Sequence, residues 1–235
     1  MQLAGFDSRV AFVTGGARGI GRCIAETLRD LGARVAAGDL KAPEIDGVLG
    51  VELDVTDEAS VDAAFSRVER ELHPVDLLVL NAGIFRIEPL EETTLESWQQ
   101  TIDVNLTGAF LCAKRGLPAM RERGYGRLVA IGSSAGKTGG AKSVAAYGAS
   151  KAGVMTLAKA IASEYAASGV TSNALAPALI DTEMIASMPD LRDKVPVGRL
   201  GTPQDVADVV AFLCSEHAGY ITGEVVDVNG GFLID

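Results

Sequence analysis

Short runs rich in β-branched residues alternate with longer stretches of helical period, and this alternation constrains the fold more than any other feature of the sequence. Runs such as VDLLVL (75–80) do not alternate between apolar and polar residues, which is typical of strands buried on both faces. Buried strands joined by helices form a parallel sheet that helices cover on both sides. The sequence therefore predicts an α/β fold, and 235 residues suit a single domain over 1–235.

The predicted elements follow one another without a linker, a repeat or a low-complexity tract. Strands are expected at residues 9–14, 34–38, 50–54, 76–80, 127–132, 170–176 and 223–228. Helices are expected at residues 19–31, 58–72, 95–123, 145–168 and 203–215. Pro118 falls inside the third helix and predicts a kink or break there. Residues 181–199 hold Met184 and Met188 without a clear period, so we interpret them as a flexible lid.

Charge and cysteine content exclude several classes of protein. Lys plus Arg number 21 and Asp plus Glu 31, a net charge of −10, which argues against nucleic-acid and anionic-membrane partners. Cys23, Cys112 and Cys214 are far apart, so neither a disulfide framework nor a thiolate zinc site is indicated, and we expect no metal. The N-terminus does not resemble a signal peptide, and no apolar run reaches the ~18 residues that span a bilayer. We therefore expect a cytoplasmic protein.

A glycine-rich loop, TGGARGIG (14–21), joins the first predicted strand to the first helix. Gly15 allows a sharp turn, Gly19 lets the backbone approach a pyrophosphate, and Gly21 lets the helix pack closely on the sheet. The free N–H groups and the dipole of the helix start then favour an anion. A tight turn without a ligand is the alternative, whereas a P-loop is excluded because no Gly-Lys-Ser/Thr follows.

Asp39 ends the second predicted strand, 39 − 21 = 18 residues after Gly21, close to the ~20 expected for a carboxylate that binds an adenosine ribose. A carboxylate accepts hydrogen bonds from ribose hydroxyls and repels a 2′-phosphate, so Asp39 favours NAD over NADP. Arg18 instead favours NADP, because a cation in the glycine loop can hold the 2′-phosphate.

Tyr147 and Lys151 lie four residues apart in YGASK, on one face of a predicted helix. An ammonium group nearby favours the phenolate, so we expect Lys151 to lower the pKa of Tyr147. Such a tyrosine can exchange the proton of a hydroxyl or carbonyl oxygen. The alternative is that both side chains lie on a solvated helix face without a function. The glycine loop earlier in the chain favours the functional interpretation of the pair.

With these motifs on hand, the chain resembles the short-chain dehydrogenase/reductase family over nearly its full length. The matching segments are TGGARGIG (14–21), Asp54-Val55, Asn81-Ala82-Gly83, DVNLTG (103–108), IGSSAG (131–136), YGASK (147–151) and the segment from Pro177 to Thr182. The resemblance implies a single-domain, doubly wound Rossmann fold with a seven-stranded parallel sheet, a nicotinamide cofactor, and a tetramer or dimer of identical chains.

The resemblance also implies a role for each matching residue. The catalytic residues would be Asn105, Ser133, Tyr147 and Lys151, with Asn105 positioning a water that links Lys151 to solvent. The cofactor-binding residues would be Gly15, Arg18, Gly19, Ile20, Gly21, Asp39, Asp54, Val55, Asn81, Ala82, Gly83, Tyr147, Lys151, Pro177, Ile180 and Thr182.

Two positions depart from the family pattern. Ser133 ends its strand, as the family's serine does, but lies 147 − 133 = 14 residues before Tyr147, whereas Ser134 has the commoner spacing of 13. We choose Ser133, because strand register fixes a position more firmly than the glycine-rich loop that follows. Ala178 replaces the family's usual glycine and must avoid a positive φ or be strained.

Two other functions remain as alternatives. Gly132 to Gly136 match G-x-S-x-G, with Asp205 or Asp208 and then His217 downstream, as in a serine hydrolase. That motif requires a helix directly after the serine, whereas the following residues are glycine-rich and predict a loop. A dinucleotide sensor without catalysis is the second alternative, although it has no need for all four catalytic residues.

The segments 199–216 and 220–231 resemble both 3-oxoacyl-acyl-carrier-protein reductases and NAD-dependent secondary-alcohol dehydrogenases. A carrier-protein reductase needs a basic docking surface, and this acidic chain offers only Arg121, Arg123 and Arg127 in one region. We therefore expect an NAD-dependent oxidoreductase of a small alcohol/ketone pair, with a 3-oxoacyl-acyl-carrier-protein reductase using NADPH as the alternative. Ile84 and Phe85 are candidate substrate-facing residues.

Overall fold

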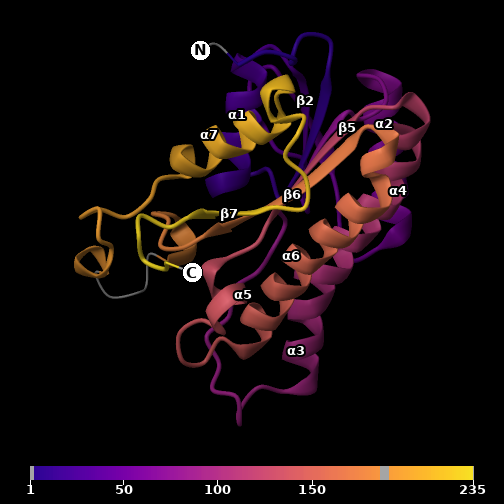
Figure 1. Ribbon diagram of the computed structural model, residues 1–235. Helices are drawn as coiled ribbons and strands as arrows, with labels where there is room; N and C mark the ends of the chain where they lie inside the picture. The colour runs from indigo at the N-terminus through magenta and orange to yellow at the C-terminus, as the bar shows by residue number, and fades with distance from the viewer. Residues whose placement is uncertain (1–2, 186–190, 235) are drawn as a thin grey trace.

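A computed structural model describes residues 3–185 and 191–234, and within them the chain forms a seven-stranded parallel sheet flanked by helices (Figure 1). The strand order is β3-β2-β1-β4-β5-β6-β7, and every paired strand is parallel to its neighbour. The strands are β1 (Val10–Thr14), β2 (Arg34–Asp39), β3 (Val48–Glu52), β4 (Leu77–Leu80), β5 (Gly126–Ile131), β6 (Val170–Pro177) and β7 (Val225–Val228). The predicted α/β fold is confirmed.

Helices cover both faces of the sheet, as the alternating sequence pattern predicts. The α-helices are α1 (Gly19–Asp30), α2 (Glu58–Glu71), α3 (Leu95–Ile102), α4 (Gly108–Arg123), α5 (Ser134–Thr138), α6 (Ala145–Tyr165) and α7 (Pro203–Cys214). The short 3₁₀ turns are η2 (Ala166–Ser168), η3 (Glu183–Ile185), η4 (Arg192–Lys194) and η5 (Glu216–Ala218). Among the described residues, no helix is both long and apolar enough to cross a membrane.

Two hydrophobic cores lie on the two faces of the sheet, and β1 contributes to both because successive side chains point to opposite faces. Phe12 packs with Phe65 of α2 in the core that also holds side chains of α4 and α6. Ala11 and Val13 pack instead in the core beneath α1 and α7, with Ile24. The strands are therefore buried on both sides, which explains why their sequences do not alternate.

The predicted long helix at 95–123 differs in detail from the structure. A π-helical turn, η1 (Asp103–Thr107), separates α3 from α4, whereas Pro118 lies inside α4 without ending it. The prediction of a break at Pro118 was therefore wrong. The helical path is interrupted before Pro118, at the π turn η1, which is wider than an α-helical turn and contains Asn105.

The predicted lid is described only in part. Met184 lies in η3 and is exposed, while Met188 falls outside the described residues. On the two sides of that gap, η3 and η4 give the segment short 3₁₀ turns rather than a regular helix.

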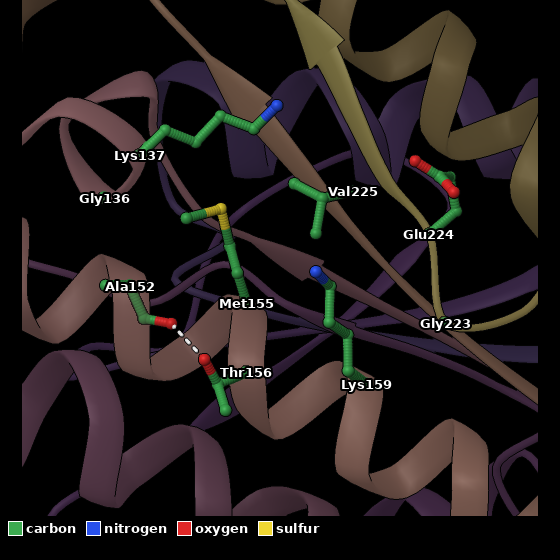
Figure 2. Close-up of a pocket in the computed structure, with 9 residues that line it drawn as sticks. All are labelled: Gly136, Lys137, Ala152, Met155, Thr156, Lys159, Gly223, Glu224 and Val225. Atoms are coloured by element: carbon green, nitrogen blue, oxygen red, sulfur yellow. Dashed lines mark hydrogen bonds between the residues drawn. The ribbon is translucent and has the colours of Figure 1, made fainter. Parts of the chain in front are cut away.

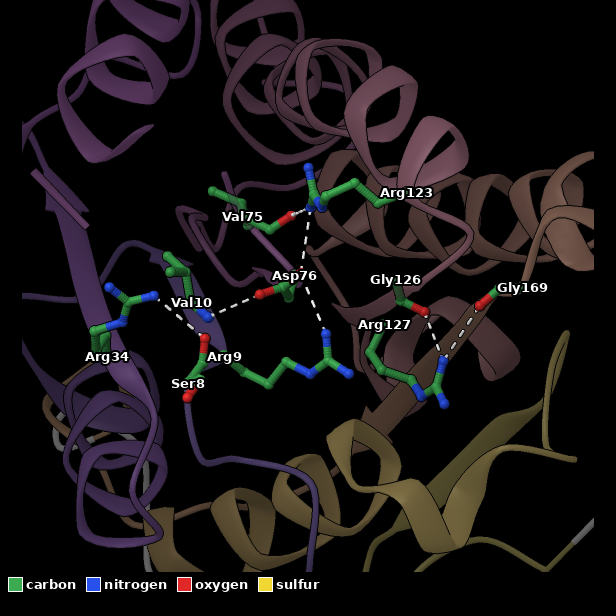
Figure 3. A network of polar contacts seen from close by, with 10 residues as sticks. All are labelled: Ser8, Arg9, Val10, Arg34, Val75, Asp76, Arg123, Gly126, Arg127 and Gly169. Carbon is green, nitrogen blue, oxygen red and sulfur yellow. Dashed lines mark hydrogen bonds and ion pairs between the residues drawn. The ribbon is translucent and has the colours of Figure 1, made fainter. Parts of the chain in front are cut away.

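A polar network closes the sheet at the amino-terminal ends of its strands (Figure 3). Asp76, which is 8% exposed, accepts a hydrogen bond from the Val10 N–H through Oδ2 at 3.1 Å. Its Oδ1 lies 3.7 Å from Nη1 of Arg9 and 3.4 Å from Nη2 of Arg123. The Arg9 guanidinium also lies over the Tyr125 ring, 3.7 Å from its centroid. This carboxylate therefore joins β1, the start of β4 and the end of α4.

Candidate active site

The candidate site lies at the opposite, carboxyl-terminal ends of the strands. There the strand order reverses, because the chain proceeds outward from β1 to β3 on one side and from β4 to β7 on the other. In open parallel sheets, ligands bind in the crevice at such a switch point. The glycine loop between β1 and α1 lies at this point, beside the end of β4.

Three of the four glycines in the loop, Gly15, Gly19 and Gly21, meet different surroundings. Gly15 has a φ of +65°, and a Cβ there would lie 2.8 Å from the Ala82 Cα. A Cβ on Gly21 would lie 2.1 Å from the carbonyl oxygen of Gly15, so no side chain fits. Gly19 has a φ of +54°, and a Cβ there would meet, among the described atoms, nothing nearer than Cγ2 of Thr182 at 3.8 Å. Only at Gly19 does the loop face open space.

The start of α1 is able to hold an anion. No side chain of the described residues caps the helix at Arg18, and its first turn contains no acidic residue. The first N–H groups of a helix have no partner within it, and the dipole there is positive. The open cradle at Gly19 and this uncapped helix start together fit the pyrophosphate of a dinucleotide.

Asn81 holds the glycine loop against the end of β4. Its Nδ2 donates to the carbonyl oxygens of Thr14 at 3.0 Å and Gly15 at 2.9 Å. The N–H groups of Asn81 and Ala82 both donate to the Thr14 hydroxyl. Asn81 and Ala82 therefore lie against the glycine loop, and the Asn81 amide is engaged in fixing the shape of the loop.

Asp39 lies beside the same loop. Its Oδ2 accepts the N–H of Ala17 at 3.1 Å, and its Oδ1 accepts the N–H of Leu40 at 2.9 Å. Arg18 points elsewhere: its Nη1 lies 2.9 Å from Oε2 of Glu183, and both side chains are exposed. The structure therefore places a carboxylate, and not the Arg18 guanidinium, at the end of β2.

Asp54 and Val55 follow β3, and their side chains are engaged with the protein. Oδ1 of Asp54 accepts both the N–H and the hydroxyl of Thr56. Val55 packs against α4, where a Cβ on Gly108 would lie 2.6 Å from it. The predicted contact of these two residues with an adenine ring stays a prediction.

Ser133 and Tyr147 come together at the end of β5. Ser133 is the N-cap of α5, where its Oγ accepts the N–H of Ala135 at 3.1 Å, and its hydroxyl also forms a hydrogen bond with Tyr147. Ser134 is the first residue of α5, and its carbonyl oxygen accepts the Thr138 hydroxyl. The serine that reaches the phenol is Ser133.

Burial changes the proton affinity of both members of the Tyr-Lys pair. Desolvation raises the pKa of Tyr147 above its ordinary value, and the hydrogen bond with Ser133 lowers it by less. The prediction that Lys151 lowers this pKa was therefore wrong for the protein as described, because removing water from the phenolate has the larger effect. Lys151 is 5% exposed, and burial lowers the pKa of its amine to about 8.

The Lys151 amine is held behind the tyrosine. Its Nζ donates to the carbonyl oxygen of Ile131 at 2.7 Å and lies 5.8 Å from the Tyr147 ring centroid. A Cβ on Gly83 would lie 3.3 Å from this Nζ and 3.2 Å from Oδ1 of Asn105. The amine and the amide converge on position 83, so a side chain there would require both to shift by a few tenths of an ångström.

Asn105 links the π turn to the segment after β4. Its Oδ1 accepts the N–H of Ile84 at 2.7 Å, and its Nδ2 donates to the carbonyl of Ile84 and to the Ser150 hydroxyl, both at 3.0 Å. All three of these bonds go to protein atoms, and the predicted role of Asn105 in positioning a water stays a prediction. No sequence pattern signals this anchoring of Ile84, because the π turn that orients Asn105 has no simple pattern.

The segment after β6 forms the remaining wall of the cleft. Pro177 ends β6, Ile180 is buried and pairs with Gly201, and the Thr182 hydroxyl donates to the carbonyl of Ile180. Positive φ angles at described residues other than glycine occur at Ser8, His73 and Ser143. Ala178 therefore avoids the strained conformation, and its substitution for glycine costs the backbone nothing there.

The serine-hydrolase alternative fails on geometry. A helix, α5, does follow Ser133 directly and includes Lys137 and Thr138, so the predicted loop over 137–143 is confirmed only at 139–143. However, His217 lies in η5, next to Gly219, and a Cβ on Gly219 would lie 3.7 Å from Arg127 at the start of β5. Ser134 lies beyond the other end of β5, so the histidine and serine are separated by the length of the strand.

A pocket of about 320 Å³ lies between α5, α6 and the start of β7 (Figure 2). Figure 2 shows Lys137 and Lys159 reaching toward Val225 from opposite sides. Lys137 Nζ lies 2.5 Å from Oδ2 of Asp227, so an ion pair ties α5 to β7. The lining includes Gly136 and Lys137 but not Tyr147, so this pocket adjoins the catalytic cluster without containing it.

A glycine-loop cleft at the switch point and a Ser-Tyr-Lys cluster beside it define a nicotinamide-dependent oxidoreductase of the Rossmann type. Comparison with known proteins identifies the family: a family model described as enoyl-(acyl carrier protein) reductase matches residues 15–233. The chain belongs to the short-chain dehydrogenase/reductase family and is an oxidoreductase that acts on CH–OH and keto groups.

Individual relatives cover nearly the whole chain. The 3-oxoacyl-[acyl-carrier-protein] reductase MabA of Mycobacterium tuberculosis is 43% identical over 231 residues, which are 96% of this chain and 93% of MabA. An acetoacetyl-CoA reductase of Rhizobium meliloti is 43% identical over 237 residues, 95% of this chain and 98% of the relative. The structure of a ligand-free aldohexose dehydrogenase of Thermoplasma acidophilum superposes with a TM-score of 0.92 at 33% identity, covering 98% of this chain and 96% of that one.

Proposed function

We propose that this protein reduces the ketone of a 3-oxoacyl thioester to a 3-hydroxyacyl thioester. The observation that carries the proposal is the cluster of Ser133, Tyr147 and Lys151 beside the open cradle at Gly19. Sequence similarity to a 3-oxoacyl-[acyl-carrier-protein] reductase and an acetoacetyl-CoA reductase supports a thioester substrate over the small alcohol expected from the sequence.

The reduced nicotinamide cofactor would supply a hydride to the ketone carbon. The start of α1 and Gly19 would hold its pyrophosphate, Lys151 a ribose hydroxyl, and Ile180 and Thr182 its carboxamide end. These residues fit because the cradle is open only at Gly19 and because the helix start is uncapped among the described side chains.

In the proposed reaction, negative charge develops on the ketone oxygen as its carbon accepts the hydride. The hydroxyls of Ser133 and Tyr147 donate hydrogen bonds to that oxygen and stabilise the transition state. The Tyr147 proton then passes to the oxygen, which yields the alcohol and a Tyr147 phenolate. The phenolate regains a proton from the neighbouring Lys151 ammonium group, which is itself reprotonated from solvent. A raised pKa keeps Tyr147 protonated at neutral pH, so it is prepared to act as an acid in the reducing direction.

The proposed cofactor is NADH. Asp39 lies half-buried at the end of β2, where its carboxylate repels a 2′-phosphate, while Arg18 is paired with Glu183. NADPH remains the second candidate, because Arg18 is exposed and can leave its partner.

Oxidation of a secondary alcohol or sugar with NAD is the second candidate function, which Asp39 and the similarity to an aldohexose dehydrogenase favour. Initial rates decide between the two. We expect the kcat/KM for acetoacetyl-CoA with NADH to exceed that for glucose with NAD at least 100-fold. A higher kcat/KM for glucose than for the thioester would overturn the proposal.

A further inference from the structure

The segment between β4 and α3 runs along the catalytic tyrosine and is fixed at two points. Residues 81–89 form neither helix nor turn. Asn105 binds both backbone groups of Ile84, and the N–H of Glu88 donates to the carbonyl of Ser143 at 2.7 Å. The backbone between these anchors is therefore held in place without a regular element.

Charged and apolar side chains alternate along this segment. Arg86 and Glu88 both turn toward α3, where each forms a hydrogen bond with the Ser97 hydroxyl. Phe85 turns the other way, and its ring meets the Tyr147 ring edge-to-face, with centroids 4.9 Å apart and planes at 83°. Arg86 and Glu88, two residues apart, share Ser97 as a partner, which is the alternation of an extended chain and would place Ile87 on the side of Phe85.

Ile87 is unusual for a large apolar residue, since 54% of it is exposed. It lies about 7 Å along the chain from Phe85, two residues at the rise of an extended backbone. Phe85 and Ile87 therefore make a short apolar strip that begins at the proton donor and leads to solvent. Arg86 and Glu88 are turned away toward Ser97, so neither charge lies on this side.

We propose that Phe85 and Ile87 form the wall along which the acyl chain of the substrate lies beyond its 3-oxo group. The inference rests on the proposed function and narrows it to 3-oxoacyl thioesters whose chain extends past four carbons. A hydrocarbon chain gains from this contact, whereas a polyhydroxylated chain loses hydrogen bonds to water against a phenyl ring. Each methylene that reaches full burial would raise kcat/KM about fourfold.

The experiment compares two substrates, acetoacetyl-CoA and 3-oxooctanoyl-CoA, in three forms of the protein. Ile87→Ser shortens the wall, and Leu95→Ser is the matched control, because Leu95 is 80% exposed at the start of α3, outside the segment. Both are surface changes, so folding is not at stake. We expect the wild-type protein and Leu95→Ser to prefer the eight-carbon substrate at least tenfold in kcat/KM, through KM, and Ile87→Ser to lose most of that preference.

A second variant, Phe85→Ser, removes the part of the wall beside Tyr147 and should abolish the preference altogether. Equal kcat/KM for both thioesters in the wild-type protein, or an unchanged preference in Ile87→Ser and Phe85→Ser, overturns the inference while leaving thioester reduction intact. Failure to reduce either thioester overturns the proposed function instead. Loss of an oligomer in Ile87→Ser, measured by sedimentation, would show that a second copy of the chain covers the wall and would overturn the inference too.

Discussion

The two ends of the parallel sheet place charged groups in opposite circumstances. At the amino-terminal ends, the Asp76 carboxylate is buried with a backbone N–H and two guanidinium groups as partners. At the carboxyl-terminal ends, the Lys151 amine is equally buried, but its described hydrogen bond goes to a neutral carbonyl oxygen of Ile131. The first end pairs its buried charge with opposite charges, whereas the second holds a buried amine whose described partner is neutral.

This difference shows which end of the sheet contributes to the stability of the fold and which end lowers it. A buried charge with ionic partners resists removal, because its loss leaves those partners unpaired. A buried charge without a counter-ion is less stable than in water, which is why the pKa of Lys151 falls to about 8. Changes at the carboxyl ends should therefore alter chemistry, and changes at the amino ends should alter folding.

The largest expected effect is on chemistry. Tyr147→Phe removes the proposed proton donor and should lower kcat about 10³- to 10⁴-fold, the range for loss of a general acid. Because Phe preserves the edge-to-face contact with Phe85, the free energy of unfolding and the Kd for NADH should change little. Turnover within tenfold of the wild-type value would contradict the role of Tyr147.

The next effect separates the two serines. Ser133→Ala should lower kcat about 10²- to 10³-fold, since one donor to the developing oxyanion is lost. Ser134→Ala is the control at the neighbouring position and should retain kcat within a few fold. If the second variant is the inactive one, the assignment of Ser133 is wrong.

Removal of the buried carboxylate tests the other end of the sheet. Asp76→Ala leaves the Val10 N–H and two guanidinium groups without their acceptor, so the free energy of unfolding should fall by about 3 kcal/mol. Denaturant unfolding measures this loss, and Asp30→Asn, at an exposed ion pair with Arg29, should change it by less than about 1 kcal/mol. A folded Asp76→Ala protein should keep its kcat; a large loss of kcat would contradict the division between the two ends.

The buried amine should act on stability in the opposite direction, and with a dependence on pH. Lys151 releases its proton near pH 8 in the folded protein but at about its ordinary 10.5 when unfolded, so the folded state bears the cost of the charge below pH 8. Between pH 8 and 10.5 the amine binds more protons in the unfolded state, so its contribution to the free energy of unfolding rises with pH by about 3 kcal/mol.

Lys151→Met carries no such proton. The stability of the variant relative to the wild-type protein should therefore fall by about 3 kcal/mol between pH 7 and pH 10.5. Denaturant titrations of both proteins across this range measure the difference. A relative stability independent of pH would show that folding does not lower the pKa of the Lys151 amine.

The smallest expected effect concerns the cofactor. Asp39→Ala removes the repulsion of a 2′-phosphate and should shift the ratio of kcat/KM for NADPH to that for NADH upward about tenfold, or about 1.4 kcal/mol. Asp46→Ala, at another acidic residue in the turn between β2 and β3, serves as the control. A ratio unchanged in Asp39→Ala would mean that Asp39 does not read the ribose.

The sequence by itself determined the layered α/β fold and the place of the glycine loop between β1 and α1. Strands buried on both faces appear in the sequence as apolar runs without alternation. Gly15, Gly19 and Gly21 indicate a tight turn between a strand and a helix. Both features are local, because they depend on residues that are close together in the chain. The i, i+4 spacing likewise placed Tyr147 and Lys151 on one helix face.

Only the tertiary structure decided how these groups behave. The raised pKa of Tyr147, the engagement of Arg18 by Glu183 and the anchoring of Ile84 by Asn105 arise between residues distant in the chain. Desolvation and ion pairing depend on what surrounds a group in space, and spacing along the chain carries no measure of that. The sequence could name the proton donor, but its proton affinity is a property of the packed site.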